Sequence, residues 1–502
     1  MTGTRMNRMD WRLIRRSALT VALGCVLAFG AVAADPQPAP KAAPKTAKEP
    51  TSVKRNHEQI IKAIGLYDDQ SIQDYVNEVG RRVSAVSDLP GADFKFYVLD
   101  EEGINAFTTG CCRVYVNRGL LVSLNSEAEL AAVLGHEIGH VTGRHPQKQQ
   151  TAGILAQVLA AGAAVATGSQ AVSDLANLGA MAGFRGYGRS QEMEADRLGL
   201  AYFTRAGYRA ESMGDVFKMF KDGERFELER ARAEGREPQI YHGLLSTHPA
   251  PDARAIQAAK GAARAGSGPD SGGVDRRDEY LRRIEGIAFG SSKAQGVLRE
   301  NRMYHEPLGI TLAFPRAWTV ENRPDKVVAY TPAKDAFLIM ELIPKDPKKP
   351  MTPREALLAF AKGLSFSGGE AFDSNGMPGY MALSRNGSPL DQGAGPMRFV
   401  AIQRGDGFFI FYGSSKASRN GVPEADGLIQ GVAQTLRGLK PSEFPLAEPF
   451  RIKIEKARDG TQLSSYADAM PVERYKREEL ELINGVYPGG NPRPGQLFKV
   501  VE

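Results

Sequence analysis

The chain has 502 residues, of which 42% are hydrophobic and 24% are charged, so it is long enough to build two or three hydrophobic cores. Its formal net charge of +6 is small for this length, and no basic stripe with interleaved aromatic residues occurs. This composition excludes a dedicated nucleic-acid-binding protein. Three cysteines are too few for a disulfide framework, so core packing and metal must stabilise the fold.

The amino terminus has the features of a secretory signal peptide. Three arginines between positions 12 and 16 precede an apolar run that is short for a membrane span, and small residues at 31–33 offer a cleavage site. Residues 35–54 continue as a linker rich in Pro, Ala and Lys. We therefore expect a cleaved signal peptide over residues 1–34, export to the periplasm, and no transmembrane span in the mature chain.

Two further features concern the membrane. Cys25 is a poor lipidation site, because Leu23 stands one position too close to it. A second apolar stretch, Ile154 to Ala166, has about 13 residues and is too short to cross a bilayer. We expect it to form a buried helix or a helix that covers a cleft.

The segment that follows Asn125 predicts an α-helix. Ser126 and Glu129 form a capping box, and the apolar residues of AELAAVLGHEIGHV recur at helical spacing. We expect the helix to begin near Asn125 or Ser126 and to end at Pro146.

His136, Glu137 and His140 stand near the end of this helix in the pattern His-Glu-x-x-His. Residues four apart differ by about 400° around an α-helix, so the two histidines share one face and can bind one metal ion. The Glu137 carboxylate can take a proton from a water at that ion, which is the division of labour in a zinc peptidase. The short pattern also occurs in unrelated proteins, where its histidines are ordinary polar groups.

A catalytic zinc site needs a third protein ligand. His145 follows closely, as in the metzincin pattern, but that pattern places its histidine where this chain has Pro146. In a continued helix His145 would lie about 140° away from His140. We expect His145 at the surface or beside a ligand, and not on the metal.

A better third ligand lies in the segment from Ser190 to Phe203. Glu192 and Asp196 are four residues apart and share a helix face, so Glu192 can bind the metal while Asp196 accepts a hydrogen bond from one of the two histidines. Glu194 is the rival ligand. It would lie about 200° from Glu192 around the helix, so both cannot face the zinc. The remaining alternative is a solvated acidic turn.

Taken together, these two motifs resemble those of a known family of zinc proteases. GHEIGH followed by E-x-x-A-D-R-x-G resembles the gluzincin-type zinc endopeptidase family that contains HtpX, the periplasmic protease BepA and the CAAX prenyl proteases. The resemblance runs from about Arg55 to Ala259. It implies a mainly helical metalloprotease domain with a small β-sheet over residues 55–260. It also implies one zinc ion per chain, bound by both histidines and Glu192, with Glu137 as the catalytic base.

The segment from Ile104 to Leu121 is similar to the N-A-F strand of this family and to the hairpin that follows it. Such a strand holds substrate in extended form through main-chain hydrogen bonds. The resemblance therefore implies substrate contacts at Asn105 and Ala106.

The segment STHPAPDAR resembles the family's His-Pro segment near the metal. It implies that His248 stabilises the oxyanion or occupies the open zinc position at rest, and that Arg254 supports this arrangement. The alternative is a loop histidine with a structural arginine, because motif matches need geometry to confirm them.

Cys111 and Cys112 depart from the glycine-rich turn that relatives tend to carry after the N-A-F strand. Adjacent cysteines can form a vicinal disulfide, stay reduced, bind stray metal, or serve only as small turn residues. If they respond to oxidation, they would alter the strand beside the active site.

After the protease region the composition changes. Residues 261–299 contain a linker rich in Gly, Ser and Asp and a short helical segment. Residues 300–440 combine β-like runs with one helical stretch, TPREALLAFAKGL. This predicts an α+β domain with Trp318 in its core and no catalytic constellation, which we interpret as a packing or substrate-docking module.

Residues 447–502 resemble the LysM fold, with a strand, helices, an Asn-Gly turn and a final strand. The resemblance implies a small βααβ module that binds peptidoglycan-type glycan through loops around Gly460, Thr461 and Asn484. A purely structural terminal domain is the alternative, since resemblance in fold does not establish a site.

The chain is thus expected to be an α+β multidomain protein and a periplasmic zinc-dependent endopeptidase. Its expected substrates are unfolded or misassembled envelope proteins, and the resemblance to BepA implies quality control of outer-membrane protein assembly. Association with the outer membrane or with peptidoglycan is left open. The competing interpretation is a noncatalytic, peptidoglycan-associated chaperone or scaffold with a structural zinc site, although such a site has no use for a general base at Glu137.

Overall fold

The computed structural model describes residues 51–148, 187–235, 238, 251–264, 273–322, 326–346, 348–472 and 474–502. The expected signal peptide, the apolar stretch from Ile154 to Ala166, and His248 lie outside these residues. None of the helices in the described ranges combines the length and the apolar character needed to cross a membrane.

The first described part combines helices with a three-stranded sheet. Its elements are α1 (Thr51–Ile64), α2 (Gln70–Ser84), β1 (Lys95–Leu99), β2 (Ala106–Thr108) and β3 (Arg113–Asn117). β3 lies in the middle of the sheet, parallel to β1 and antiparallel to β2, so β2 is an edge strand. This confirms the hairpin expected after the N-A-F strand. α1 begins at Thr51, inside the stretch that was expected to be linker.

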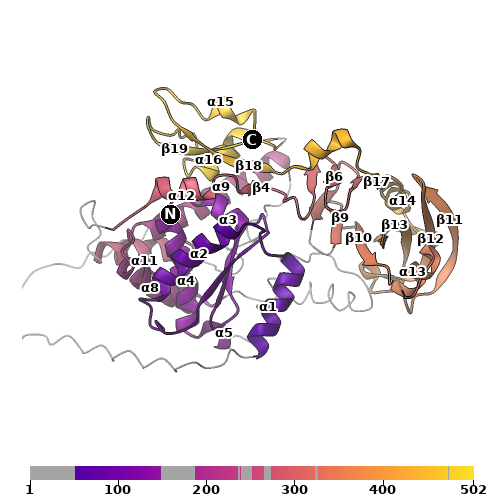
Figure 1. Ribbon diagram of the computed structural model, residues 1–502, viewed down its shortest axis with the longest axis horizontal. Helices are drawn as coiled ribbons and strands as arrows, with labels where there is room; N and C mark the ends of the chain where they lie inside the picture. The colour runs from indigo at the N-terminus through magenta and orange to yellow at the C-terminus, as the bar shows by residue number, and fades with distance from the viewer. Residues whose placement is uncertain are drawn as a thin grey trace, which may run out of the picture. The chain divides into compact units, whose positions relative to one another are not determined.

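Helices dominate the chain that follows. They are α3 (Arg118–Ser123), α4 (Glu127–Thr142), α5 (His145–Lys148), α8 (Arg189–Arg205), α9 (Ser212–Glu234), α11 (Pro251–Arg264) and α12 (Arg277–Ile284). α4 packs against α2, α8 and α9, which lie around it in Figure 1. Every residue of α4 from Glu127 to Val141 is buried, which explains why the helix is apolar on all sides.

The start of α4 agrees with the sequence prediction. The Ser126 hydroxyl accepts a hydrogen bond from the Glu129 amide at 3.2 Å, and the Glu129 carboxylate accepts one from the Asn125 amide at 2.7 Å. The predicted end was wrong, because α4 stops at Thr142. Arg144 then adopts a left-handed conformation with φ of 57°, which reverses the chain. Pro146 lies in the first turn of α5, where its missing N–H is tolerated.

The middle of the chain is mainly antiparallel sheet. Its elements are β5 (Val297–Arg299), β6 (Arg302–His305), β7 (Ile310–Ala313), β8 (Thr319–Asn322), β9 (Lys326–Tyr330), β10 (Ala336–Pro344), α13 (Pro353–Phe360), β11 (Phe366–Ser374), β12 (Met377–Ser388), β13 (Gly395–Arg404), β14 (Gly407–Ser415), α14 (Asp426–Gln434) and β17 (Arg437–Gly438). Seven strands form one sheet in the order β11-β12-β13-β14-β10-β9-β8, and four short strands form another in the order β17-β7-β6-β5.

Both faces of the seven-stranded sheet are covered. Phe409 and Phe411 of β14 share a cluster with α14 and with Trp318, which confirms Trp318 as a core residue. Phe408 and Ile410 point to the other face and share a cluster with α13. This alternation is the two-residue period of a strand, and it leaves β14 buried on both sides. Figure 1 shows α13 and α14 beside these strands.

The C-terminal segment has the predicted β-α-α-β order. It contains β18 (Phe450–Lys456), α15 (Ser464–Ala467), α16 (Lys476–Ile483) and β19 (Leu497–Val501). β18 pairs with β19 and also with β4 (Ala288–Phe289), both antiparallel. The identity of this segment as a LysM-like module stays a prediction.

The C-terminal segment shares its hydrophobic core with α4. Ile452, Leu480 and Phe498 belong to the same buried cluster as Leu130 of that helix. The side-chain nitrogen of the fully buried Lys499 donates hydrogen bonds to the carbonyls of Val122 and Leu124 at 2.6 and 2.7 Å. These carbonyls lie just before α4, so the end of the chain supports the beginning of that helix.

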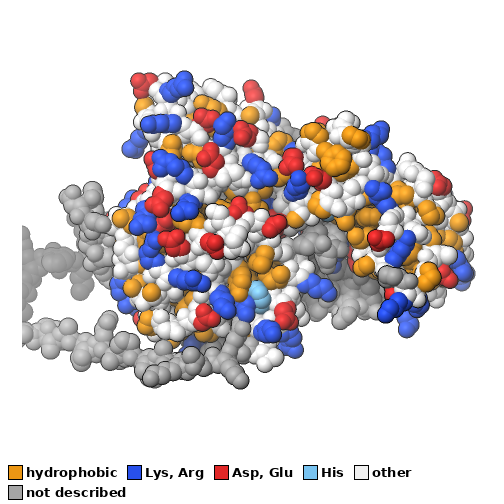
Figure 2. Space-filling model, viewed as in Figure 1, with side chains coloured by type: hydrophobic (Ala, Val, Ile, Leu, Met, Phe, Trp, Pro, Cys, Tyr) orange, Lys and Arg blue, Asp and Glu red, His pale blue; other side chains and the backbone are white. Residues whose placement is uncertain are grey.

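The surface in the view of Figure 2 carries Lys and Arg side chains interspersed with Asp and Glu. Exposed ion pairs among the described residues include Arg225 with Glu229 at 2.9 Å and Lys453 with Glu502 at 3.1 Å. Pairs of this kind contribute less than about 1 kcal/mol each to stability. The fold is therefore held mainly by its cores and its buried polar contacts.

Candidate active site

Glycines let α4 and α8 cross closely. A Cβ atom added to Gly139 would lie 2.7 Å from the carbonyl oxygen of Ala195, and one added to Gly199 would lie 2.7 Å from the amide nitrogen of His136. Real Cβ atoms cannot approach backbone this closely, so only glycine fits at both positions. The crossing places the first turns of α8 beside the last turns of α4.

Three ligand atoms meet at this crossing. His136 Nε2 lies 3.0 Å from His140 Nε2, and the Glu192 carboxylate oxygens lie 3.6 Å from the first nitrogen and 3.4 Å from the second. Tetrahedral zinc with bonds of about 2.0–2.1 Å requires ligand atoms about 3.3–3.4 Å apart. All three residues are buried, and together they form a group that can hold a metal ion. The donor set and its spacing fit zinc.

Asp196 and Arg254 brace two of these ligands. Asp196 accepts a hydrogen bond from His136 Nδ1 at 2.8 Å, as its position on α8 led us to expect. Arg254 of α11 donates to Asp196 at 2.7 Å and to Glu192 at 2.8 Å. Burial favours a raised pKa for Asp196, but the hydrogen bonds from Arg254 and His136 outweigh burial and lower this pKa to about 2. Asp196 is therefore a carboxylate at neutral pH.

His145 is fully buried and contacts His140, so it is a partner of a ligand and not a surface residue. The two Nδ1 atoms are 2.8 Å apart, and His145 Nε2 lies 3.3 Å from a carboxylate oxygen of Glu194. The expected swing of about 140° from His140 assumed a continued helix. The chain reverses at Arg144 instead, which returns His145 to the end of α4. The Glu194 side chain is half-exposed whereas Glu192 is fully buried.

Glu137 is fully buried on the wall of a small pocket that is lined mainly by residues of α4 and α9. The polar residues on the rest of the wall are the candidate ligand His136 and the two bracing residues Asp196 and Arg254. Its apolar residues are Ala132, Val133, Met213, Val216, Phe217 and Phe220. The Glu137 carboxylate therefore lies beside the expected metal and out of contact with bulk solvent. A general base for a metal-bound water requires this position.

Comparison with known proteins agrees with this geometry. The family described as Peptidase family M48 matches residues 70–263. The chain contains a peptidase family M48 domain. The match begins at the first residue of α2 and ends within α11. The M48 domain therefore contains His136, His140 and Glu192, the three residues that can hold a metal ion.

Several curated proteins are similar to the M48 domain. The beta-barrel assembly-enhancing protease of Escherichia coli K12 is 30% identical over 202 residues, which are 38% of this chain and 39% of that protein. The protease of the same name from Yersinia pestis is 30% identical over 195 residues, 37% of this chain and 38% of that protein. The mitochondrial metalloendopeptidase OMA1 of Arabidopsis thaliana is 33% identical over 144 residues, 28% of this chain and 29% of that protein. The chain thus spans about two fifths or less of the length of these relatives.

Tyr187 is a residue of the M48 domain that the sequence reasoning missed. Its ring stacks on His140 with centroids 3.9 Å apart, and it is almost fully buried. Burial, with smaller effects from Glu137 and Glu192, raises the pKa of Tyr187 well above its usual value. Tyr187 therefore stays neutral and confines the His140 ring. A lone tyrosine outside any motif offered no signal by which to find it.

Ala106 is the first residue of the edge strand β2, which packs against α4, and Asn105 precedes it. Both side chains are buried, and the Asn105 carbonyl accepts a hydrogen bond from the Asn117 amide at 2.9 Å. Substrate contact at these two residues stays a prediction, and their buried side chains restrict it to the main chain.

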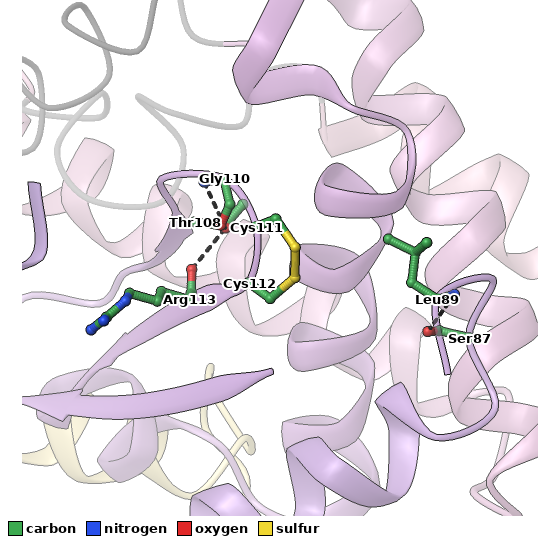
Figure 3. Close-up of a disulfide and its surroundings, with 7 residues drawn as sticks. All are labelled: Ser87, Leu89, Thr108, Gly110, Cys111, Cys112 and Arg113. Atoms are coloured by element: carbon green, nitrogen blue, oxygen red, sulfur yellow. Dashed lines mark hydrogen bonds between the residues drawn. A yellow bond between two sulfur atoms is a disulfide. The ribbon is translucent and has the colours of Figure 1, made fainter. Parts of the chain in front are cut away.

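Cys111 and Cys112 form a disulfide in the turn between β2 and β3 (Figure 3). Of the alternatives left open by the sequence, the structure has the vicinal disulfide. The Thr108 hydroxyl donates to the Arg113 carbonyl at 2.8 Å and closes the turn. Cys112 is buried in the main core, against which Leu89 packs. An effect of oxidation on peptidase activity stays a prediction.

We expect Gly139→Ala to destabilise the M48 domain by about 1–3 kcal/mol, because the added methyl group overpacks the helix crossing. It should also weaken zinc binding, since α8 must move away and carry Glu192 with it. Urea unfolding of the zinc-free protein and zinc titration measure the two effects. Gly223→Ala in α9 is the matched control, because its Cβ meets nothing within 4 Å and alanine favours a helix by up to about 1 kcal/mol. A Gly139→Ala variant as stable as the wild type would show that the crossing does not depend on glycine.

Proposed function

We propose that this protein is a periplasmic zinc-dependent endopeptidase that hydrolyses peptide bonds of unfolded or misassembled envelope proteins. One observation carries the proposal: His136, His140 and Glu192 bring three buried ligand atoms together, with Glu137 on the wall of the adjoining pocket. Similarity to peptidase family M48, and to relatives named as beta-barrel assembly-enhancing proteases, supports it.

The proposed chemistry assigns a task to each of these residues. When bound, zinc lowers the pKa of its water to about 7 and polarises the scissile carbonyl. Glu137 accepts a proton from the attacking water and passes it to the leaving amine. Asp196 and Arg254 hold His136 and Glu192 in place, which keeps the ligand atoms at the spacing the metal needs.

The edge strand β2 supplies a surface for the substrate. Because its outer edge has no partner strand in the described sheet, main-chain groups near Asn105 and Ala106 can pair with an extended peptide. In this proposal His248 stabilises the oxyanion or occupies the open zinc position at rest. An extended, unfolded segment is the substrate that such a strand selects.

The finer proposals rest on the sequence and on the relatives. Residues 1–34 direct export, and the names of the relatives suggest a role in the assembly of outer-membrane β-barrels. Residues 447–502 bind peptidoglycan glycan if they act as a LysM-like module. Gly460 and Thr461 then provide the contact, because the buried Asn484 side chain already bonds to the backbone of Lys499 at 2.8 and 2.9 Å.

Metal removal tests the proposal. We expect the exported form of the chain to bind one zinc ion and to cleave casein, to lose this activity on chelation, and to regain it when zinc is restored. Zinc content and casein cleavage are measured on the same samples. Equal, background-level cleavage by the zinc-loaded and zinc-free protein would favour a noncatalytic scaffold with a structural zinc site.

A further inference from the structure

The two histidines of the candidate zinc site, His136 and His140, have different hydrogen-bond partners at Nδ1. His136 Nδ1 meets the carboxylate of Asp196 at 2.8 Å, which is the usual partner of a metal-binding imidazole. His140 Nδ1 instead meets another imidazole, His145 Nδ1, also at 2.8 Å. His145 is as completely buried as His140, whereas Glu194, the next group in the chain of contacts, is 44% exposed.

The positions of the protons follow from this chain of contacts. His140 Nε2 faces His136 and Glu192, so it must carry a lone pair to bind a metal, and its proton is on Nδ1. The Nδ1–H of His140 can then only donate, and His145 Nδ1 must accept. His145 in turn carries its proton on Nε2, which faces the Glu194 carboxylate 3.3 Å away. Each tautomer fixes the next.

The backbone is shaped to bring His145 to this position. A Cβ on Gly143 would lie 2.7 Å from His145 Nε2, so glycine leaves the space that the imidazole fills. Arg144 adopts φ of 57°, a left-handed conformation that is unfavourable for a residue other than glycine. These two residues make a reversal after α4 that points His145 back at His140.

We propose that His145 is a positioning residue of the zinc site: it accepts the Nδ1–H bond of His140, and so fixes the tautomer and ring orientation in which Nε2 binds the metal. The inference rests on the proposed function and deepens it. The partner of His136 Nδ1 is a carboxylate, and the partner of His140 Nδ1 is an imidazole.

The test compares three substitutions at position 145. His145→Leu and His145→Ala remove the acceptor, whereas His145→Asn replaces Nδ1 by an amide oxygen at a similar distance from the backbone. The zinc dissociation constant is measured by competition with a chromophoric chelator in the absence of substrate, and unfolding of each zinc-free variant is followed in parallel. His305→Leu in β6 is the control for loss of a partly buried histidine outside the M48 domain.

We expect His145→Leu to weaken zinc binding by about 10- to 100-fold, the range typical for partners of metal ligands, and His145→Asn to stay within about threefold of the wild type. At saturating zinc, casein cleavage by His145→Leu should show a lower kcat with an unchanged KM. If the Leu variant does not fold, the Ala variant is compared with the Asn variant in its place. Glu194→Gln keeps an acceptor for His145 Nε2–H and should bind zinc like the wild type.

Two results would overturn the inference. Zinc affinities that are the same in the Leu, Ala and wild-type proteins would show that His140 needs no partner at position 145. An Asn variant as weak as the Leu variant would show that the imidazole acts through its bulk and not as an acceptor. A wild-type protein that binds no zinc would overturn the proposed function itself, which is a different outcome and is read from the same titration.

Discussion

Replacing Glu137 by glutamine should lower kcat for casein cleavage by about 10²- to 10⁴-fold while the protein still binds zinc, because general base catalysis contributes a factor of this size. Glutamine keeps the shape of the side chain but cannot accept a proton from the attacking water. Glu137 is fully buried on the pocket wall beside the metal ligands and is not itself one of them, so zinc content should not change.

The matched control for this prediction is Glu78→Gln in α2, where the glutamate side chain is 60% exposed and pairs with Arg82 on the same helix. Its cleavage rate should equal that of the wild type. Casein cleavage by Glu137→Gln at the wild-type rate, with equal zinc content in both proteins, would assign the general base to another residue.

The second large effect is expected at Arg254. Its side chain is almost fully buried between the carboxylates of Asp196 and Glu192, and its guanidinium lies 5.1 Å from the centre of the Phe217 ring. Arg254→Met fills much of the volume but leaves two buried carboxylates without their cation. Breaking a buried ion pair in this way costs about 3–5 kcal/mol, so the free energy of unfolding of the zinc-free protein should fall by that amount.

Two further variants separate charge from geometry. Arg254→Lys keeps the positive charge but loses the planar fork that reaches both carboxylates, so its stability should lie between those of the wild type and the Met variant. Arg282→Met in α12 removes an exposed arginine whose pair with Asp278 is 3.8 Å long, and it should change stability by less than about 0.5 kcal/mol. Urea denaturation of all four proteins is the measurement. A Met variant that matches the wild type would mean that Asp196 and Glu192 are neutral in the zinc-free protein.

The grouping of His136, His140 and Glu192 could be predicted because its signals are local. The two histidines are four residues apart on one helix, and so are Glu192 and Asp196 on another, so helical geometry alone decides which side chains share a face. Whether α4 and α8 meet depends on tertiary packing. Their close crossing requires Gly139 and Gly199, and no rule about residue spacing indicates the role of these glycines.

His145 shows where reasoning from local periodicity fails. That His145 does not bind the metal stays a prediction, and the expected direction of its side chain depended on a helix that in fact ends at Thr142. A reversal at a non-glycine residue such as Arg144 is rare enough that the sequence gives little warning of it. Tyr187 was missed for a related reason, since it reaches His140 through tertiary packing alone.

Part of the strand and helix content after residue 300 was also predictable, because runs rich in β-branched and aromatic residues are typical of strands. The strands β11 and β12 and the helix α14 were not predicted. The order of the strands was not predictable. β10 pairs with the adjacent β9 and also with β14, whose residues are more than 60 positions away, and local patterns do not encode such a distant partner. The same holds for the C-terminal segment, whose elements were expected but whose core, shared with α4, was not.

That shared core sets an order of events during folding. The carbonyls of Val122 and Leu124, just before the zinc-binding helix, receive their hydrogen bonds from Lys499, which follows them by 377 and 375 residues. Contacts over such separations form slowly, because a long loop must close before they contribute. During synthesis the chain therefore contains all of residues 70–263 well before Lys499 can bond to the carbonyls that precede α4. Synthesis of the M48 domain and completion of its fold are separate in time, and the interval between them is set by the length of the chain from residue 264 to Lys499.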